Sequence, residues 1–396
     1  MKRLKRFLSF ALCAAMLVPS AAGRISAADT DGGTSAAPPA EDIAPFDVDA
    51  VSAVLMDLAT GTVLYAKNAV EALPPASVTK IMTLLLVMEA IDGGQLSLTD
   101  TVQISDYAAS MGGSQVYLKA GEEMSVEDLL KSTVISSAND AAVALAEKVS
   151  GSAEVFVSRM NERAAQLGMT STHFENPTGL DDNVTNHTTS AYDIALMSRE
   201  LMKHETIMNY TSIWMDTIRD GAFGLTNTNR LIRFYSGATG LKTGSTAKAK
   251  FCISATAKRE GMHLCAVIMG SPSRDIRNEA AKALLDWGFA NYYTYSDAGA
   301  DAGTVPVRGG VDSEVSVSYG PCELLLPSSR RNSVEITLDI PDELTAPVRS
   351  GERVGRVIYS SGGETLAEGE VTADRDVPKI SYGEILRRIL SSFLLI

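Results

Sequence analysis

The sequence is poor in cysteine and histidine, and these shortages exclude two classes of protein. Its 396 residues include four cysteines and four histidines. So few cysteines do not describe a secreted scaffold held together by disulfides, so core packing must supply the stability. The segment that begins like a zinc-protease helix, His204-Glu205-Thr206-Ile207-Met208, has methionine where the second histidine ligand belongs. We therefore predict neither a metal site nor a cofactor.

Positive charge is also scarce. The chain has 35 lysines and arginines against 48 aspartates and glutamates, a formal net charge of -13. Binding to a nucleic-acid backbone needs clustered basic side chains, so we expect no nucleic-acid partner. A hydrophobic fraction of 45% with 21% charged residues is typical of a globular protein, which at this length has two or three domains.

The apolar run near the N-terminus is too short to cross a membrane, for which about 20 residues are needed. This run, Phe7 to Val18, follows four basic residues among the first six and precedes a stretch of small residues. The pattern is typical of a secretion signal, and we predict a signal peptide at 1–28 with Ala22 or Ala28 as cleavage points. The protein is therefore expected to be exported.

Loss of the signal, which contains Cys13, leaves three cysteines: Cys252, Cys265 and Cys322. Cys252 and Cys265 lie in two apolar runs joined by the turn-like segment KREG. This pattern predicts a β-hairpin with two buried free thiols. A disulfide between Cys252 and Cys265 is the alternative.

The composition divides the rest of the chain into successive segments. Residues 29–45 have too few large apolar residues to pack and are predicted to be a linker. Residues 46–295 begin with a hairpin, continue with helical patterns and return to three strands, which predicts an α+β domain whose antiparallel sheet pairs both ends of the segment. Small and acidic residues at 296–303 mark a break, and residues 304–376 are predicted to form a small all-β domain.

The last segment, 377–396, has the spacing of an amphipathic helix. Apolar side chains from Tyr382 to Ile396 fall on one face, and Glu384, Arg387 and Arg388 lie opposite. The helix, of about 16 residues, is too short to cross a bilayer. We predict that it lies in the membrane interface and anchors the protein peripherally to the outer face of the cytoplasmic membrane. The alternative is that its apolar stripe packs on the β domain.

A hydroxyl and an amine open a strongly apolar helix in the stretch PPASVTKIMTLLLVMEA, residues 74–90. Ser77 and Lys80 are three residues apart, so on a helix they share one face and the amine can reach the hydroxyl. A neutral lysine at this position can activate a serine nucleophile. The alternative is an ordinary N-cap at Ser77 with the Lys80 amine extended to solvent. The same spacing also recurs at Ser245 to Lys248.

Two further motifs each occur once in the chain. Ser137-Ala138-Asn139 lies between two helical patterns, and Lys242-Thr243-Gly244 lies in a predicted strand. Taken alone, Ser137 or Asn139 could be a helix cap and Lys242 a surface lysine. In the order Ser-x-x-Lys, Ser-x-Asn, Lys-Thr-Gly, the three motifs together indicate an active site built on a serine nucleophile.

With these motifs the chain resembles the serine D-alanyl-D-alanine carboxypeptidases, the low-molecular-mass penicillin-binding proteins that trim bacterial cell-wall peptides. The resemblance covers nearly the whole chain and includes the contexts PPASVTKIMT, SSANDAA, NPTGLD and LKTGST. It implies a β-lactamase/transpeptidase-like catalytic domain that needs no cofactor. It also implies peptidoglycan stem peptides ending in D-Ala-D-Ala as substrates and β-lactam antibiotics as covalent inhibitors.

The resemblance implies a role for each residue of the first two motifs. Ser77 would be the nucleophile and would form an acyl-enzyme with the penultimate D-alanine. Lys80 would be its general base, with a pKa lowered by burial and by the nearby ammonium of Lys242. Ser137 would pass a proton to the leaving amine, and Asn139 would hold the substrate backbone and Lys80.

The third motif would bind the substrate. Lys242 and Thr243 would meet the terminal carboxylate of a peptide lying along a sheet edge, and Gly244 would allow its close approach. The backbone N–H groups of Ser77 and Ser245 would form the oxyanion hole.

Two arginines could also bind a substrate carboxylate. Arg230 and Arg277 are candidate carboxylate partners, each with a surface salt bridge as the alternative.

Two rival functions remain. A β-lactamase on the same scaffold needs an added group that hydrolyses the penicilloyl-enzyme, and has no need of the β domain or the terminal helix. A catalytically silent wall-binding protein would keep the fold, but here the motifs are intact. We therefore predict a D-Ala-D-Ala carboxypeptidase.

Overall fold

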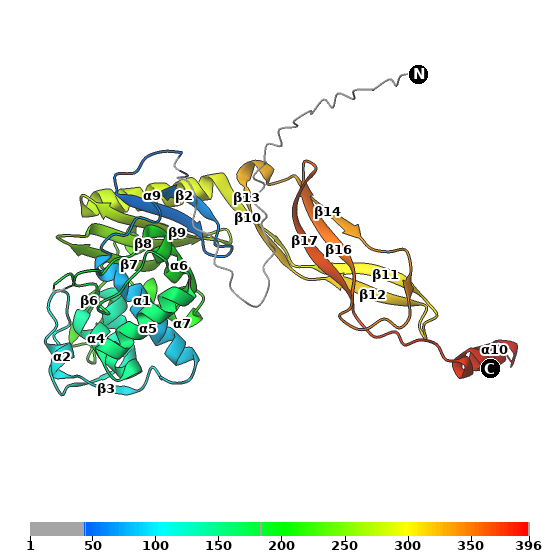
Figure 1. Cartoon of the computed structure of the whole chain (residues 1–396), viewed down its shortest axis with the longest axis horizontal. Helices are drawn as coiled ribbons and strands as arrows, with labels where there is room; N and C mark the ends of the chain where they lie inside the picture. The colour runs from blue at the N-terminus through cyan, green and yellow to red at the C-terminus, as the bar shows by residue number, and fades with distance from the viewer. Residues whose placement is uncertain (1–42, 44, 183, 395–396) are drawn as a thin grey trace, which may run out of the picture.

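The computed structural model describes residue 43 and residues 45–182 and 184–394. The predicted signal peptide at 1–28 and nearly all of the predicted linker at 29–45 lie outside these residues. Figure 1 shows a larger body of helices and sheet, followed by an elongated all-β body and a C-terminal helix. The predicted fold class is confirmed.

A five-stranded antiparallel sheet organises the larger body, in the order β2-β1-β9-β8-β7. Its strands are β1 (Ser52–Asp57), β2 (Val63–Lys67), β7 (Ala238–Thr246), β8 (Lys250–Arg259) and β9 (Met262–Ser271). Because β1 pairs with β9, the two sequence ends of this body lie side by side, as predicted. β7, which contains the Lys-Thr-Gly motif, is an edge strand.

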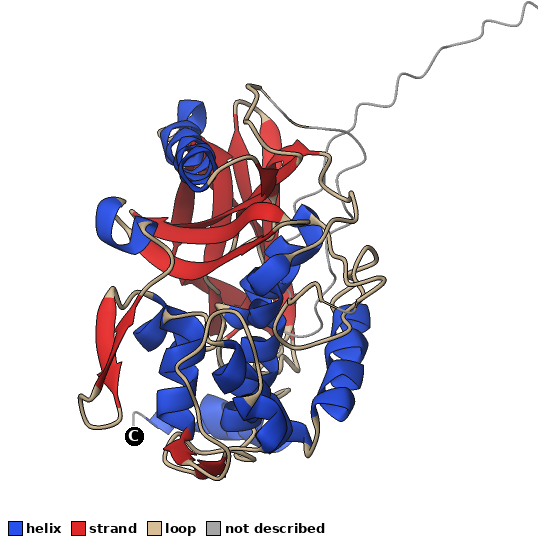
Figure 2. Ribbon diagram, turned by 90° about the vertical axis from the view of Figure 1, so that its left-hand side faces the viewer, coloured by secondary structure: helices blue, strands red, loops and turns tan. Residues whose placement is uncertain are grey.

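Helices cover both faces of this sheet (Figure 2). On one face α9 (Arg274–Asn291) closes a core with residues of β1, β8 and β9. On the other face lies a larger core around α1 (Lys80–Asp92), in which ten of the 13 residues are buried. A helix that is buried on all sides must be apolar on all sides, which is what the sequence of α1 provides.

The remaining elements of this body surround α1. The helices are α2 (Asp106–Ala109), α3 (Val126–Ile135), α4 (Asn139–Ser150), α5 (Ala153–Gln166), α6 (Ala191–Leu201), α7 (Glu205–Thr211) and α8 (Leu231–Phe234). Two short strand pairs join β3 (Thr101–Gln103) with β4 (Glu123–Ser125), and β5 (Met215–Ile218) with β6 (Phe223–Thr226).

Two capping residues set the outer ends of the helices that flank the Ser-x-Asn motif. Ser125 accepts a hydrogen bond from the backbone N–H of Asp128 and caps α3. Gly151, with φ of 81°, ends α4 in the left-handed conformation that glycine favours. Since α3 ends at Ile135 and α4 begins at Asn139, the motif occupies the break between the two helices.

The all-β body contains a six-stranded sheet, in the order β14-β16-β17-β12-β11-β15, and a two-stranded pair β10-β13. Its elements are β10 (Tyr292–Asp297), β11 (Ala300–Arg308), β12 (Glu314–Tyr319), β13 (Cys322–Pro327), η2 (Ser328–Arg330), β14 (Val334–Asp339), β15 (Leu344–Thr345), β16 (Arg353–Ser361) and β17 (Glu364–Ala373). The composition break at 296–303 contains the end of β10, a turn at Gly299 with φ of 78°, and the start of β11. It therefore falls between strands of two different sheets.

The two cysteines of the predicted hairpin form no disulfide. Cys252 and Cys265 are buried and free, so the alternative of a disulfide between them is wrong.

α10 (Tyr382–Leu394) lies at the end of the all-β body remote from the larger body (Figure 1). Its apolar side chains are exposed, from 38% for Ile385 to 93% for Tyr382, so the stripe does not pack on the β domain. Within the described ranges, no helix has the length and apolarity needed to span a membrane.

Candidate active site

Ser77 lies in a one-turn 3-10 helix, η1 (Ala76–Thr79), directly before α1. Ala76 has φ of 50°, a strained conformation for a residue with a β-carbon and one that often marks functional sites. Ser77 does not cap α1, whose N-cap position is Thr79, and Lys80 is 0% exposed. The alternative of an ordinary N-cap with a solvent-exposed lysine is therefore wrong.

The Lys80 amine has three oxygen partners. Its Nζ lies 3.0 Å from Ser77 Oγ, 2.6 Å from Asn139 Oδ1 and 2.8 Å from the Thr178 carbonyl oxygen. Burial, and then the positive charge of Lys242, hold the pKa of Lys80 well below its ordinary value, against a smaller opposing effect of Asp140. A neutral amine has two N–H donors for the two carbonyl-type oxygens, which leaves its lone pair for the Ser77 hydroxyl. This is the geometry of a nucleophile with its base.

The Ser-x-Asn motif supports this pair from the break between α3 and α4. Ser137 has φ of 61°, and its side chain lines the cleft above Ser77. Asn139 is 2% exposed, and its Nδ2 donates a 2.7 Å hydrogen bond to the Gly112 carbonyl. Because its Oδ1 accepts from Lys80, both ends of the Asn139 amide are engaged. The structure therefore places Asn139 on Lys80 rather than in the open cleft.

The Lys-Thr-Gly strand runs along the other side of Ser77. Lys242 is 1% exposed and donates a 2.9 Å hydrogen bond to the Thr243 carbonyl. Burial, followed by the charge of Arg277, lowers the pKa of Lys242 to about 7. A β-carbon at Gly244 would lie 2.8 Å from the Ser77 nitrogen and 2.9 Å from the Pro75 carbonyl oxygen. Glycine at this position is what lets β7 approach the Ser77 turn.

These residues surround a cleft of about 620 Å³. Its lining combines small hydroxyl residues with aromatic and basic side chains: Ser77, Ser114, Ser137, Trp214, Thr226, Asn227, Thr228, Arg230, Phe234, Thr243, Gly244, Ser245, Arg274 and Arg277. Lys80, Asn139 and Lys242 lie buried beneath it. The structure thus brings all three motifs together around Ser77, and places both candidate arginines in the same cleft.

Sequence reasoning missed several contributors. Thr178 and Gly112 act through backbone carbonyls, which no residue-type signal reveals. Thr228, which lies outside all three motifs, accepts a 2.8 Å hydrogen bond from the Thr243 hydroxyl. Arg274 carried a usable signal, since it lies one helical turn before the candidate Arg277. No cluster of three or more His, Cys, Asp or Glu side chains suited to a metal occurs among the residues described.

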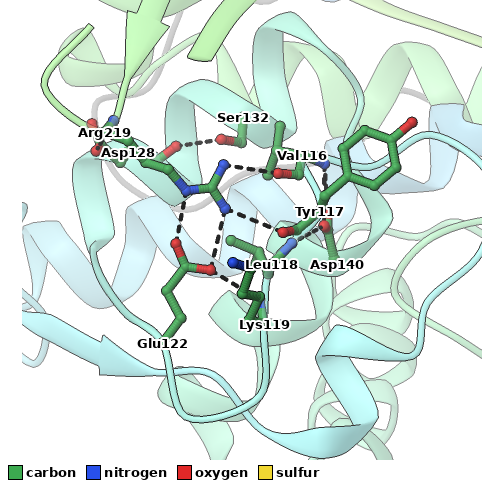
Figure 3. A network of polar contacts seen from close by, with 9 residues as sticks. All are labelled: Val116, Tyr117, Leu118, Lys119, Glu122, Asp128, Ser132, Asp140 and Arg219. Carbon is green, nitrogen blue, oxygen red and sulfur yellow. Dashed lines mark hydrogen bonds and ion pairs between the residues drawn. The ribbon is translucent and has the colours of Figure 1, made fainter. Parts of the chain in front are cut away.

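A loop beside the cleft, residues 110–122, is held from two sides (Figure 3). Arg219 donates to the Val116 carbonyl at 2.9 Å and pairs with Glu122 at 2.7 Å. The Asp140 carboxylate accepts from the backbone N–H groups of Val116 and Leu118. The loop in turn provides the Gly112 carbonyl that holds Asn139. Arg219 therefore helps to hold the loop whose Gly112 carbonyl binds Asn139, and Asn139 in turn contacts Lys80.

A seryl hydroxyl beside a buried amine of lowered pKa, at the edge of an antiparallel sheet, is the arrangement of a serine hydrolase. The family model for D-alanyl-D-alanine carboxypeptidases matches residues 35–273, and that for the C-terminal domain of penicillin-binding protein 5 matches residues 292–379. The chain belongs to the D-alanyl-D-alanine carboxypeptidase family.

Individual relatives agree with this assignment. The D-alanyl-D-alanine carboxypeptidase DacF of Bacillus subtilis is 42% identical over 352 residues, 87% of this chain and 90% of that protein. The crystal structure of penicillin binding protein 5 from Haemophilus influenzae is 31% identical with a TM-score of 0.72, and the match covers 85% of this chain and 100% of that one. Penicillin-Binding Protein D2 from Listeria monocytogenes, solved in an ampicillin-bound form, is 31% identical with a TM-score of 0.56 and covers 61% of this chain and 98% of that one. The predicted family and enzyme class are confirmed.

Proposed function

We propose that the protein removes the terminal D-alanine from peptidoglycan stem pentapeptides through an acyl-enzyme on Ser77. The observation that carries the proposal is the buried Lys80 amine, 3.0 Å from Ser77 Oγ and with a pKa held below its ordinary value. The lowered pKa favours the neutral amine, which can accept the serine proton, whereas an ammonium cannot.

The roles follow from position around Ser77. The Ser77 oxygen attacks the carbonyl carbon of the penultimate D-alanine while Lys80 takes its proton, and the backbone N–H groups of Ser77 and Ser245 stabilise the oxyanion. The C–N bond then breaks, and the departing amine of the last D-alanine receives the proton through Ser137. Water hydrolyses the resulting ester and restores Ser77.

The edge strand β7 is suited to hold the substrate. An extended peptide can add to a free strand edge and form main-chain hydrogen bonds. Thr243, which lines the cleft, and the buried charge of Lys242 would then meet the terminal carboxylate. Gly244 keeps this strand close to Ser77, so carboxylate binding and attack are geometrically linked.

We also infer that β-lactam antibiotics acylate Ser77, since the ampicillin-bound relative shares this fold. The rival β-lactamase function needs a group that activates water for rapid hydrolysis of the acyl-enzyme. In class A β-lactamases that group belongs to a Glu-x-x-x-Asn pattern. Glu205 and Asn209 have this spacing here, but they lie in α7 and neither lines the cleft. Glu205 and Asn209 therefore do not support a β-lactamase function.

The test measures D-alanine release from a stem pentapeptide beside penicillin hydrolysis and fluorescent penicillin labelling. Ser77→Ala should abolish labelling while the protein stays folded. Lys80→Arg should lose acylation as well, because arginine cannot deprotonate. Lys248→Arg, the exposed lysine of the second Ser-x-x-Lys spacing, is the matched control and should behave as wild type. Labelling that persists in Ser77→Ala, or penicillin hydrolysis faster than D-alanine release, would contradict the proposal.

The location proposed for the protein is the outer face of the cytoplasmic membrane, to which α10 would anchor it. Exposed Leu386, Leu390 and Phe393 on one face of α10, with Arg387 and Arg388 on the other, support an interfacial helix. A chain that ends at Ser381 keeps the bridge between Val348 and Val377 that closes the β domain. We expect it to leave the membrane fraction and still bind penicillin. Retention in the membrane pellet would refute the anchor.

A further inference from the structure

Four cationic side chains gather where the cleft meets Thr243. Lys242 and Arg277 are buried, at 1% and 3% exposure. Arg230 and Arg274 are exposed and line the cleft wall. In a chain of formal net charge -13, such a cluster of one sign has to be explained by what it binds.

Contacts place Arg230 and Arg277 beside the strand that contains Thr243 and Gly244. Thr243 donates to the Thr228 hydroxyl at 2.8 Å, and Arg230 follows two residues later at the start of α8. Arg277 donates to the carbonyl of Cys252, the residue that pairs with Gly244 across β7 and β8. Arg230, Arg274 and Arg277 thus line the same cleft as Thr243, where the proposed function places the terminal carboxylate of the leaving residue.

The arginines are not neutralised by the protein. Arg277 directs further N–H groups to the amide oxygen of Asn278, at 2.8 Å from Nη2. Arg230 and Arg274 form no ion pair and donate no side-chain hydrogen bond within the described part of the chain. Burial, and then the charges of Arg274 and Arg230, lower the pKa of Arg277 to about 10, and the nearby Asp275 offsets this only in part. Like charges held this close repel one another unless an anion joins them.

A single terminal carboxylate compensates one of these charges and leaves the exposed pair unmatched. We propose that Arg230 and Arg274 form a second anion subsite, which selects leaving residues that carry another carboxylate besides the terminal one. D-glutamate is the simplest residue of this class. The inference rests on the proposed function, because it uses the same nucleophile and the same carboxylate site at Thr243.

The reaction at this subsite is the hydrolysis already described, with a different leaving residue. Ser77 Oγ bonds to the carbonyl carbon of the penultimate D-alanine, and the bond to the D-glutamate nitrogen breaks. The released amine takes the proton that Lys80 removed from Ser77, and water then hydrolyses the ester. No further reactant is needed.

The test compares three diacetyl-lysyl-D-alanyl tripeptides, ending in D-alanine, D-glutamine or D-glutamate. D-glutamine matches D-glutamate in size and lacks its charge, so the ratio of their kcat/KM values isolates the second carboxylate. We expect wild type to prefer D-glutamate by roughly fivefold or more, the effect of one or two partly solvated charge pairs. Raising the salt concentration should reduce that preference.

Arg230→Gln and Arg274→Gln should each lower the D-glutamate to D-glutamine ratio, by about threefold. Arg233→Gln is the matched control. Arg233 lies in α8, which Arg230 precedes, and its guanidinium packs over the Trp214 and Phe234 rings. It is not among the residues that line the cleft. It should keep the wild-type ratio. A wild-type ratio near one, or an equal fall in all three variants, would overturn the subsite and leave the proposed function intact. Failure to release D-alanine from the first tripeptide would instead overturn the proposed function.

Discussion

Replacing Gly244 by alanine should separate catalysis from folding. The added β-carbon would lie 2.8 Å from the Ser77 nitrogen, 2.9 Å from the Pro75 carbonyl oxygen and 3.0 Å from the Ala76 β-carbon. Two of these neighbours are backbone atoms at the Ser77 turn, which cannot swing aside as a flexible side chain would. To reach ordinary van der Waals contact, β7 and the Ser77 turn must separate by roughly 0.6 Å.

That displacement acts on the nucleophile and on the proposed oxyanion hole together. A misplacement of about 1 Å in an active site can cost on the order of 100-fold in rate, and loss of one oxyanion donor costs a similar factor. We therefore expect the acylation rate of Gly244→Ala with fluorescent penicillin to fall about 100-fold, equivalent to about 2.7 kcal/mol. The thermal midpoint should drop by only a few degrees, because the strand remains paired with β8.

The control for this experiment is Gly320→Ala. A β-carbon added at Gly320 would meet no atom within 4 Å, and the residue has no positive φ, so the same substitution there adds no clash. Time-resolved labelling and thermal unfolding by circular dichroism would be measured on both variants. If Gly244→Ala acylates within about threefold of wild type at unchanged stability, the close approach of β7 is not required for catalysis.

Two further predictions concern pH. In the proposed mechanism carboxylate binding needs the charge of Lys242, and burial and Arg277 lower the pKa of Lys242 to about 7. The value of kcat/KM should therefore decline above pH 7, and Arg277→Gln should move this decline to higher pH. A decline at the same pH in Arg277→Gln would exclude Lys242 as its origin. Burial lowers the pKa of His187 to about 4, from an ordinary value of 6.5. Between these values the unfolded chain binds a proton that the native protein does not, so stability should fall as the pH drops from 6.5 to 4, by about 2 to 3 kcal/mol. Urea unfolding of His187→Gln should show a weaker pH dependence, and an unchanged one would contradict the assignment.

The sequence predicted the elements of the site better than their contacts. Ser77, Lys80 and Gly244 could be found because their chemistry depends on residue type and spacing. The left-handed backbone of Ala76 and Ser137 could not be predicted, because neither alanine nor serine favours a positive φ. The Thr178 carbonyl was equally hidden, because every residue has a carbonyl and only the fold decides where it points.

In the domain organisation, too, local patterns could be predicted from the sequence and long-range contacts could not. The hairpin, the helical patterns and the three strands could be predicted because apolar periodicity is a local signal. The small and acidic residues at 296–303 indicated a break, but composition could not reveal that strands enter it from both sides. Strand pairing depends on partners such as β12 and β13, which lie further along the chain.

The apolar sequence of α1 explains how one helix serves both the core and the catalyst. Ten buried positions make α1 the centre of the larger core, and Lys80 is the first of them. The packing that excludes water from Leu84 and Met88 also removes water from the lysine, and that desolvation is the largest cause of its lowered pKa. A more polar helix would admit water and raise the pKa of Lys80 again, so the proposed base would be lost before the fold. In the proposed mechanism a hydroxyl and an amine open this apolar helix because burial of this kind lowers the pKa of a lysine enough for it to serve as a base for serine.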